Sequence, residues 1–261
     1  MTSTRRDWKR RAILAGGALA VVGWVKGAPH LLSLGQSEIN YEDVAGLAPF
    51  RRLNGSRSVT SDVDIFAGLD APEPVTPLDT WVIEEIRNDP CKAMFGLAQA
   101  GPVPVAMFSD FRCPICDVMN ERLAELQVEA PDSFRIIRHQ LPILGASSNT
   151  ASRAVLAADL QGAYLDMYER LTRTPAVTDE KFIHALAVRI GLDADRLLHD
   201  MTSEAIDNKL RVTRRLADLF GFYGTPGFAV GRTIFLGAVS KPVLRDLIEL
   251  EVGNPCQTPK G

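Results

Sequence analysis

Two cysteines, Cys113 and Cys116, stand three residues apart in the stretch FRCPICDV, with Pro114 and Ile115 between them. This spacing suits half of a metal site, a short structural disulfide, or a thiol pair that is oxidised and reduced during a reaction. A zinc site needs a second ligand pair at similar spacing, and the other two cysteines of the chain occur singly. A structural disulfide across so few residues would restrict the unfolded chain by only about 2 kcal/mol. The spacing therefore favours redox chemistry, without a metal ion or an organic cofactor.

The flanking sequence predicts that Cys113 begins a helix. The apolar run VPVAMF is typical of a strand, and the residues from Pro114 to 130 have apolar positions at helical spacing, with proline in the first turn. A sulfur at a helix start faces unpaired N–H groups and the positive end of the helix dipole, which favours the thiolate. We therefore expect Cys113 to be the nucleophile. Cys116, one turn further on, should be shielded and should resolve the mixed disulfide.

The order of elements around the pair predicts an α/β fold. Residues 103–142 follow the pattern strand, helix, strand, and a hairpin across Gly231 and a final amphipathic helix follow near the end. Between these parts, about residues 146–221 are helical in pattern and indicate a helical insertion packed beside the sheet. Within it, residues 149–173 place apolar side chains on one stripe, including Ala157, Leu160, Tyr164 and Leu171.

The N-terminus predicts export. Arg5 and Arg6 precede an apolar run at 12–25, which is shorter than the roughly 20 residues of a spanning helix. We interpret residues 1–31 as a twin-arginine-type signal or an uncleaved membrane tether, with a Sec-type signal as the alternative. Residues 32–77 are polar and rich in turn residues, so we expect an irregular extension or linker there. We expect the part of the protein after the signal to lie in the periplasm.

The charge of the exported part excludes one class of partner. Residues 1–12 carry five basic side chains and one acidic side chain, and the whole chain has a net charge of −3, so the remainder carries −7. This remainder has no run of Lys and Arg of the kind that binding the phosphate backbone of a nucleic acid needs. We therefore expect no nucleic-acid partner.

Three motifs resemble those of the DsbA-like family of exported thiol:disulfide oxidoreductases, which have a thioredoxin fold. They are FSDFRCPIC, LPILGASSNTASRA and GTPGFAVGRTIFLG, and the resemblance runs from about residue 78 to 252. It implies a thioredoxin-like domain over 78–255, with a central mixed sheet, flanking helices and the helical insertion. It also implies a cis peptide between Thr225 and Pro226 that faces the cysteines, where an ordinary trans turn is the alternative. Substrate contacts would come from these two residues together with Pro114 and Ile115.

Two positions depart from the family pattern. Relatives often have an acidic residue six positions before the nucleophile, to relay protons, where this chain has Met107. Water or Asp110 would then have to carry protons, although Asp110 fits a loop or capping role better. The most strongly oxidising members have histidine where this chain has Ile115. Because isoleucine cannot donate a hydrogen bond to a thiolate, we expect a weaker oxidant.

Cys91 and Cys256 flank the predicted domain on either side. We expect them to form a permanent disulfide that joins the two ends, rather than two free thiols or a second redox pair. The chain-entropy model gives such a long loop an upper stabilisation of about 5 kcal/mol. The role of this bridge would be stability.

The sequence thus predicts an exported thiol:disulfide oxidoreductase that exchanges its disulfide with cysteine-containing substrate proteins. A membrane or periplasmic redox partner would recycle the cysteine pair. The alternatives are a disulfide isomerase or reductase of the same fold, and a redox-silent, chaperone-like binding protein.

Overall fold

The computed structural model describes residues 40–54, 77–96, 101–174 and 179–257. The predicted export signal at 1–31 lies outside these residues. The described strands are β1 (Asn40–Asp43), β2 (Arg51–Asn54), β3 (Val103–Ser109), β4 (Phe134–Gln140), β5 (Gly227–Val230) and β6 (Thr233–Leu236). The described helices are α2 (Pro77–Asn88), α3 (Pro90–Phe95), α4 (Pro114–Glu129), α5 (Ala146–Asp159), α6 (Tyr164–Thr172), α7 (Glu180–Arg189), α8 (Ala194–Met201), α9 (Glu204–Leu219) and α10 (Lys241–Glu251).

The six strands form one mixed sheet in the order β1-β2-β6-β5-β3-β4. β3 is parallel to β4 through the crossover helix α4, and it is antiparallel to β5, which forms a hairpin with β6. The hairpin turns at Gly231, which has φ 51°, a conformation that glycine adopts readily. This arrangement confirms the predicted thioredoxin-like fold with helices around a mixed sheet.

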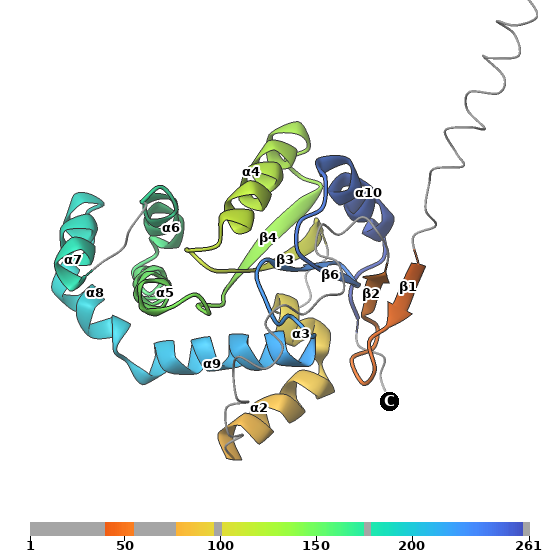
Figure 1. Cartoon of the computed structure of the whole chain (residues 1–261), viewed down its shortest axis with the longest axis horizontal. Helices are drawn as coiled ribbons and strands as arrows, with labels where there is room; N and C mark the ends of the chain where they lie inside the picture. The colour runs from red at the N-terminus through yellow and green to blue at the C-terminus, as the bar shows by residue number, and fades with distance from the viewer. Residues whose placement is uncertain (1–39, 55–76, 97–100, 175–178, 258–261) are drawn as a thin grey trace, which may run out of the picture. The chain divides into compact units, whose positions relative to one another are not determined.

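Helices cover both faces of the sheet (Figure 1). Successive side chains of a strand point to opposite faces, and β3 is buried on both. Val105 and Met107 belong to the apolar cluster that includes residues of α4 and α10. Ala106 and Phe108 belong to the cluster on the other face, with residues of α2, α3 and α9. β3 is therefore held from both sides, and it fixes the start of α4 at its end.

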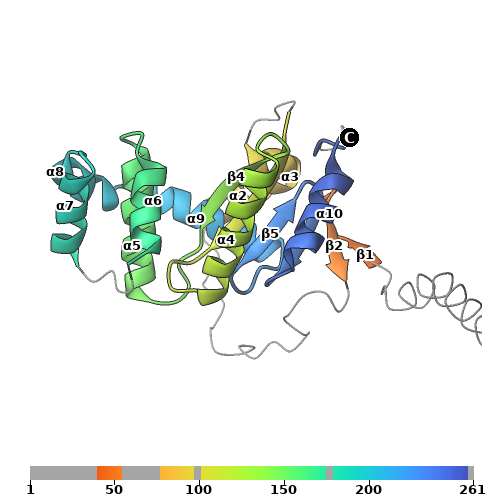
Figure 2. The ribbon, with the colours of Figure 1, turned by 90° about the horizontal axis from the view of Figure 1, so that it is seen from above.

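The predicted helical insertion lies between β4 and β5 and contains α5 to α9. Figure 2 shows α5 to α8 grouped beyond the β4 end of the sheet, and these helices have an apolar cluster of their own. The continuous stripe of inward-facing apolar side chains expected over 149–173 is wrong in one detail, because the helix is interrupted between α5 and α6. Gly162 adopts φ 75° at this break, and Leu160, expected to face inward, is 48% exposed.

The described part of the 32–77 segment differs from the irregular extension expected there. β2 pairs in parallel with β6 and lies between it and the edge strand β1. The pairing is supported by the buried carboxylate of Glu251, which accepts hydrogen bonds from Arg51 at 2.9 Å and from Arg232 at 3.1 Å. The partners of this short polar strand lie about 180 to 200 residues further on, so local sequence patterns do not predict it.

Cys91 and Cys256 form a disulfide, with Cα atoms 5.6 Å apart and a sequence separation of 165 residues. Both cysteines are buried in the apolar cluster on the α2, α3 and α9 face. The bond joins α3, near the start of the domain, to the segment that follows α10 at its end.

Candidate active site

Cys113 is the N-cap residue of α4. Its backbone is extended, with φ −96° and ψ 106°, and its sulfur accepts a hydrogen bond from the backbone N–H of Cys116 at 3.2 Å. Pro114 occupies the first helical position, where its lack of an N–H costs nothing and its fixed φ suits the helix. The local sequence therefore places the Cys113 sulfur at the positive end of the helix dipole.

The two cysteines are free thiols that differ in exposure. Cys113 is 5% exposed and Cys116 is 1% exposed, and both pack in the cluster beneath α4. Pro114 and Ile115 are exposed between them, Ile115 to 46%. Cys113 is more enclosed than a surface helix start suggests, because a second loop contacts it.

That second loop contains Thr225 and Pro226, which are joined by a cis peptide bond. The Cys113 thiol donates to the carbonyl oxygen of Thr225 at 3.4 Å. Thr225 is half-buried and Pro226 is buried, and the carbonyl of Pro226 accepts from the N–H of Gly237 at 2.8 Å. The fold thus brings the predicted loop to Cys113 across 112 residues of sequence.

The surroundings of Cys113 favour its thiolate. Its pKa is lowered to about 6, chiefly by the hydrogen bond from the Cys116 thiol and further by the Thr225 side chain and the N–H groups of Cys116 and Ile115. Burial acts in the opposite direction but does not outweigh these donors. The pKa of Cys116 is raised, first by burial and then by its hydrogen bond to Cys113. One sulfur of the pair is therefore ionised near neutral pH, while the other keeps its proton.

A model of the DSBA-like thioredoxin domain family matches residues 104–249, which is more than half of the chain. The chain belongs to this family. The match includes the cysteine pair, the helical insertion and the Thr225–Pro226 loop. Membership in the DSBA-like family agrees with the resemblance of the sequence motifs, and it assigns the cysteine pair to a family of redox-active thioredoxin-fold proteins.

Several solved structures are similar to this chain. A thioredoxin-like oxidoreductase from Silicibacter pomeroyi is 29% identical with a TM-score of 0.57, over 62% of this chain and 97% of that one. The thiol-disulfide exchange protein alpha-DsbA2 from Wolbachia pipientis is 22% identical with a TM-score of 0.56, over 67% of this chain and 98% of that one. The second likeness shows the fold alone.

The curated relatives are longer proteins. Two Na(+)/H(+) antiporters, NhaA 3 of Salinispora tropica and NhaA 1 of Salinispora arenicola, are 29% and 28% identical over 131 residues. The match covers 49% of this chain and 20% of each antiporter. Within the described residues, no helix has the length and apolar character needed to cross a bilayer.

The position of the family's acidic residue is apolar in this chain. Met107 is fully buried in the same cluster as both cysteines, so no carboxylate lies on the strand there to relay protons. The described residues contain no cluster of three His, Cys, Asp or Glu side chains that could hold a metal ion.

The sequence suggested a loop or capping role for Asp110, and the structure shows which groups its side chain holds. Its carboxylate is buried and accepts four hydrogen bonds. The donors are the N–H groups of Arg112, Ile143 and Leu144 and the hydroxyl of Ser148, at 2.6 to 2.9 Å. Both carboxylate oxygens are occupied in this way. Asp110 therefore ties the loop before Cys113 to the start of the helical insertion.

Proposed function

We propose that this protein is an exported thiol:disulfide oxidoreductase that introduces disulfides into substrate proteins through Cys113 and Cys116. The observation that carries the proposal is the Cys113 sulfur at the N-cap of α4, with a pKa lowered to about 6. A stabilised thiolate favours the reduced pair, so its disulfide tends to take electrons from other thiols.

The exchange has two steps. A substrate thiolate attacks the Cys113 sulfur of the disulfide, the bond to Cys116 breaks, and Cys116 leaves as a thiolate that takes up a proton. A second substrate thiolate then attacks the substrate sulfur of the mixed disulfide and releases Cys113 as a thiolate. The substrate loses two electrons and gains one disulfide, while the protein becomes the dithiol.

In the second step Cys113 is a better leaving group than an ordinary substrate cysteine, because its pKa is lowered to about 6. The exposed side chains of Pro114 and Ile115 and the half-buried Thr225, beside Pro226, surround the reacting sulfur. We propose that these residues contact the substrate chain, and that the backbone of the Thr225 loop pairs with it.

The reduced pair must be reoxidised before the next cycle. We propose a membrane quinone-linked enzyme as the partner that accepts the two electrons, and the periplasm as the place of action. One of the similar solved structures is a periplasmic thioredoxin-like protein from Salmonella enterica, 22% identical with a TM-score of 0.52. That likeness supports the fold, and the location in this protein is our proposal.

Trapping of mixed disulfides tests the proposal. In Cys116→Ala the Cys113 thiolate can still attack a client disulfide, which forms the same mixed disulfide and releases one client thiolate. Because Cys116 is then missing and cannot attack this bond, Cys113 should remain joined to cysteine-containing client proteins in cells. The bonds should disappear on reduction and should be absent in Cys113→Ala, which keeps the rest of the surface. Equal client capture by Cys113→Ala would instead favour redox-silent binding.

The equilibrium with glutathione separates an oxidase from an isomerase or reductase. We expect the pair to be a moderately strong oxidant, weaker than members with histidine at position 115. A potential far more reducing than that of the exported compartment would reject the oxidase and favour the reductase.

A further inference from the structure

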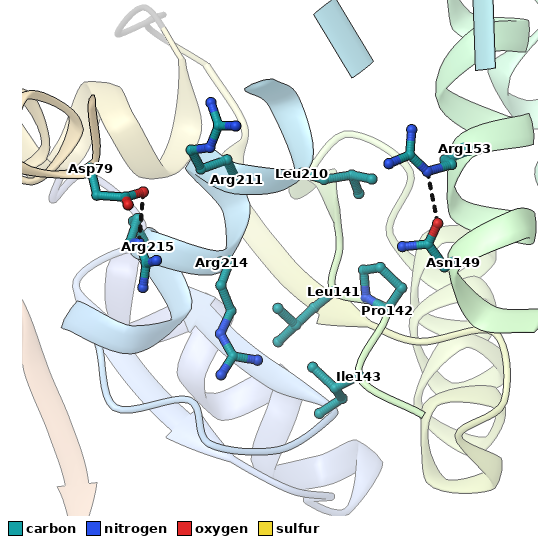
Figure 3. Close-up of a pocket in the computed structure, with 10 residues that line it drawn as sticks. All are labelled: Asp79, Leu141, Pro142, Ile143, Asn149, Arg153, Leu210, Arg211, Arg214 and Arg215. Atoms are coloured by element: carbon teal, nitrogen blue, oxygen red, sulfur yellow. Dashed lines mark hydrogen bonds and ion pairs between the residues drawn. The ribbon is translucent and has the colours of Figure 1, made fainter. Parts of the chain in front are cut away.

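A cavity of about 530 Å³ lies between α9, the start of α5 and the loop that follows β4. Its volume falls in the range of small-molecule sites, roughly 300 to 1,000 Å³. Neither cysteine of the redox pair lines it. Figure 3 shows arginine side chains of α9 and α5 around this space, with the apolar side chains of the loop after β4 beside them.

The lining is strongly basic, with four arginines and one aspartate. Three of the four arginines contact carboxylates, and two of these contacts join separate elements. Arg153 contacts Asp207 at 2.6 Å, and Arg215 contacts Asp79 at 3.0 Å. These two ion pairs join helices that form the walls of the cavity.

Arg211 and Arg214 are the remaining two. Arg211 donates from one terminal nitrogen to the neutral amide oxygen of Asn208 at 2.7 Å. Arg214 contacts Asp218 through its Nε atom at 3.1 Å, and Arg215 shares the same carboxylate at 2.9 Å. A guanidinium group has five N–H donors, so both side chains keep donors that no described residue occupies.

The other walls are apolar. Pro142 and Ile143 from the loop after β4, and Leu210 from α9, are half-buried and line the cavity. Polar donors on one part of the wall and apolar contacts on another suit a ligand that has both characters. Carboxylate and phosphate oxygens match the planar donor geometry of arginine.

We propose that this cavity binds a small organic anion, which places carboxylate or phosphate oxygens on Arg211 and Arg214 and an apolar part against Pro142, Ile143 and Leu210. The site is separate from the thiol chemistry of Cys113. A negative result for anion binding would therefore leave the proposed oxidoreductase function untouched, and the reverse also holds.

Isothermal titration calorimetry of the full chain tests this site with three probes of similar size. Phthalate and phenyl phosphate each combine an apolar ring with oxyanions, and benzyl alcohol is the uncharged control. We expect at least one anion to bind and benzyl alcohol to bind at least about tenfold more weakly, since hydrogen bonds to charged groups are the stronger ones. Preference for phthalate would indicate a carboxylate ligand, and preference for phenyl phosphate a phosphate ligand.

Single substitutions locate the binding. Arg211→Gln and Arg214→Gln should each weaken the bound anion about tenfold or more. Arg173→Gln, at the exposed C-cap of α6, is the matched control and should leave the affinity unchanged. If Arg214→Gln lowers the melting temperature, its binding result reflects stability as well as the site. The affinity of Arg211→Gln then decides the test, because Arg211 contacts a neutral amide and its replacement breaks no ion pair among the described residues.

Three results would overturn the proposal: no binding of either anion, equal binding of benzyl alcohol, or an unchanged affinity in Arg211→Gln. An equal loss in Arg173→Gln would also overturn it, because the effect would then reflect the overall charge of the protein.

Discussion

The buried carboxylate of Asp110 provides a sharp test of how the active-site loop is held. It accepts four hydrogen bonds from three separate stretches, the loop before Cys113, the turn after β4 and the first turn of α5. Asp110→Asn keeps the size of the side chain but removes its charge and replaces one acceptor oxygen with a donor NH₂ group. Whichever way the amide turns, two of the four donors lose their acceptor.

The expected loss of stability follows from these contacts. A hydrogen bond to a charged group is worth roughly 1.5 to 3 kcal/mol, so losing two of them should lower the free energy of unfolding by at least about 3 kcal/mol. Ser148→Ala removes a single donor and should cost about half as much. Asp246→Asn, at an exposed position of α10, is the matched control and should change stability by less than about 0.5 kcal/mol.

Urea unfolding measures these differences, and amide hydrogen exchange shows where they arise. The N–H groups of Ile143 and Leu144 donate to one carboxylate oxygen of Asp110, and that of Arg112 donates to the other. Depending on how the new amide turns, either the first two amides or the Arg112 amide should exchange faster in Asp110→Asn than in the parent protein. A loss below about 1 kcal/mol, or unchanged exchange at all three amides, would refute the role assigned to Asp110.

Three further predictions concern the cysteines and their neighbour. The thiolate absorbance of the reduced protein should titrate with a midpoint near 6 and vanish from that range in Cys113→Ser; a first midpoint near the ordinary value of 9.0 would contradict the site geometry. Because the pKa of Cys113 is lower in the folded state, its thiolate stabilises the reduced protein fully above about pH 9, and this contribution is lost as the pH falls through about 6. Replacing both Cys91 and Cys256 with alanine should lower the free energy of unfolding in urea by up to about 5 kcal/mol, while a change in the Cys113 titration would show that the bridge is not purely structural. Ile115→His should shift the glutathione equilibrium toward a stronger oxidant, and an unchanged equilibrium would show that a side chain at position 115 does not reach the thiolate.

Several features of this protein were predictable because their causes are local. Proline after Cys113 and the apolar spacing of α4 determine where the helix begins, and the helix start alone places the sulfur near unpaired N–H groups. The strand, helix, strand pattern of residues 103–142 similarly predicted β3, α4 and β4. The family motifs extended this prediction to the whole thioredoxin-like domain.

Other features depend on segments that are far apart in the sequence. The approach of the Thr225 carbonyl to Cys113, the four donors to Asp110 and the docking of β2 beside Glu251 each join such segments. A buried polar group requires a hydrogen-bond partner. The residues next to it in the sequence do not specify that partner, because it comes from a distant segment that packs against the group.

The sequence by itself thus determined the chemistry of the cysteine pair and the element that carries it, because helix capping acts over a few residues. Only the tertiary structure decided how deeply Cys113 lies, which loops enclose it, and that the arginines of α9 line a cavity together with α5 and the loop after β4. Burial and enclosure are properties of packed segments, and packing is settled when the whole domain folds.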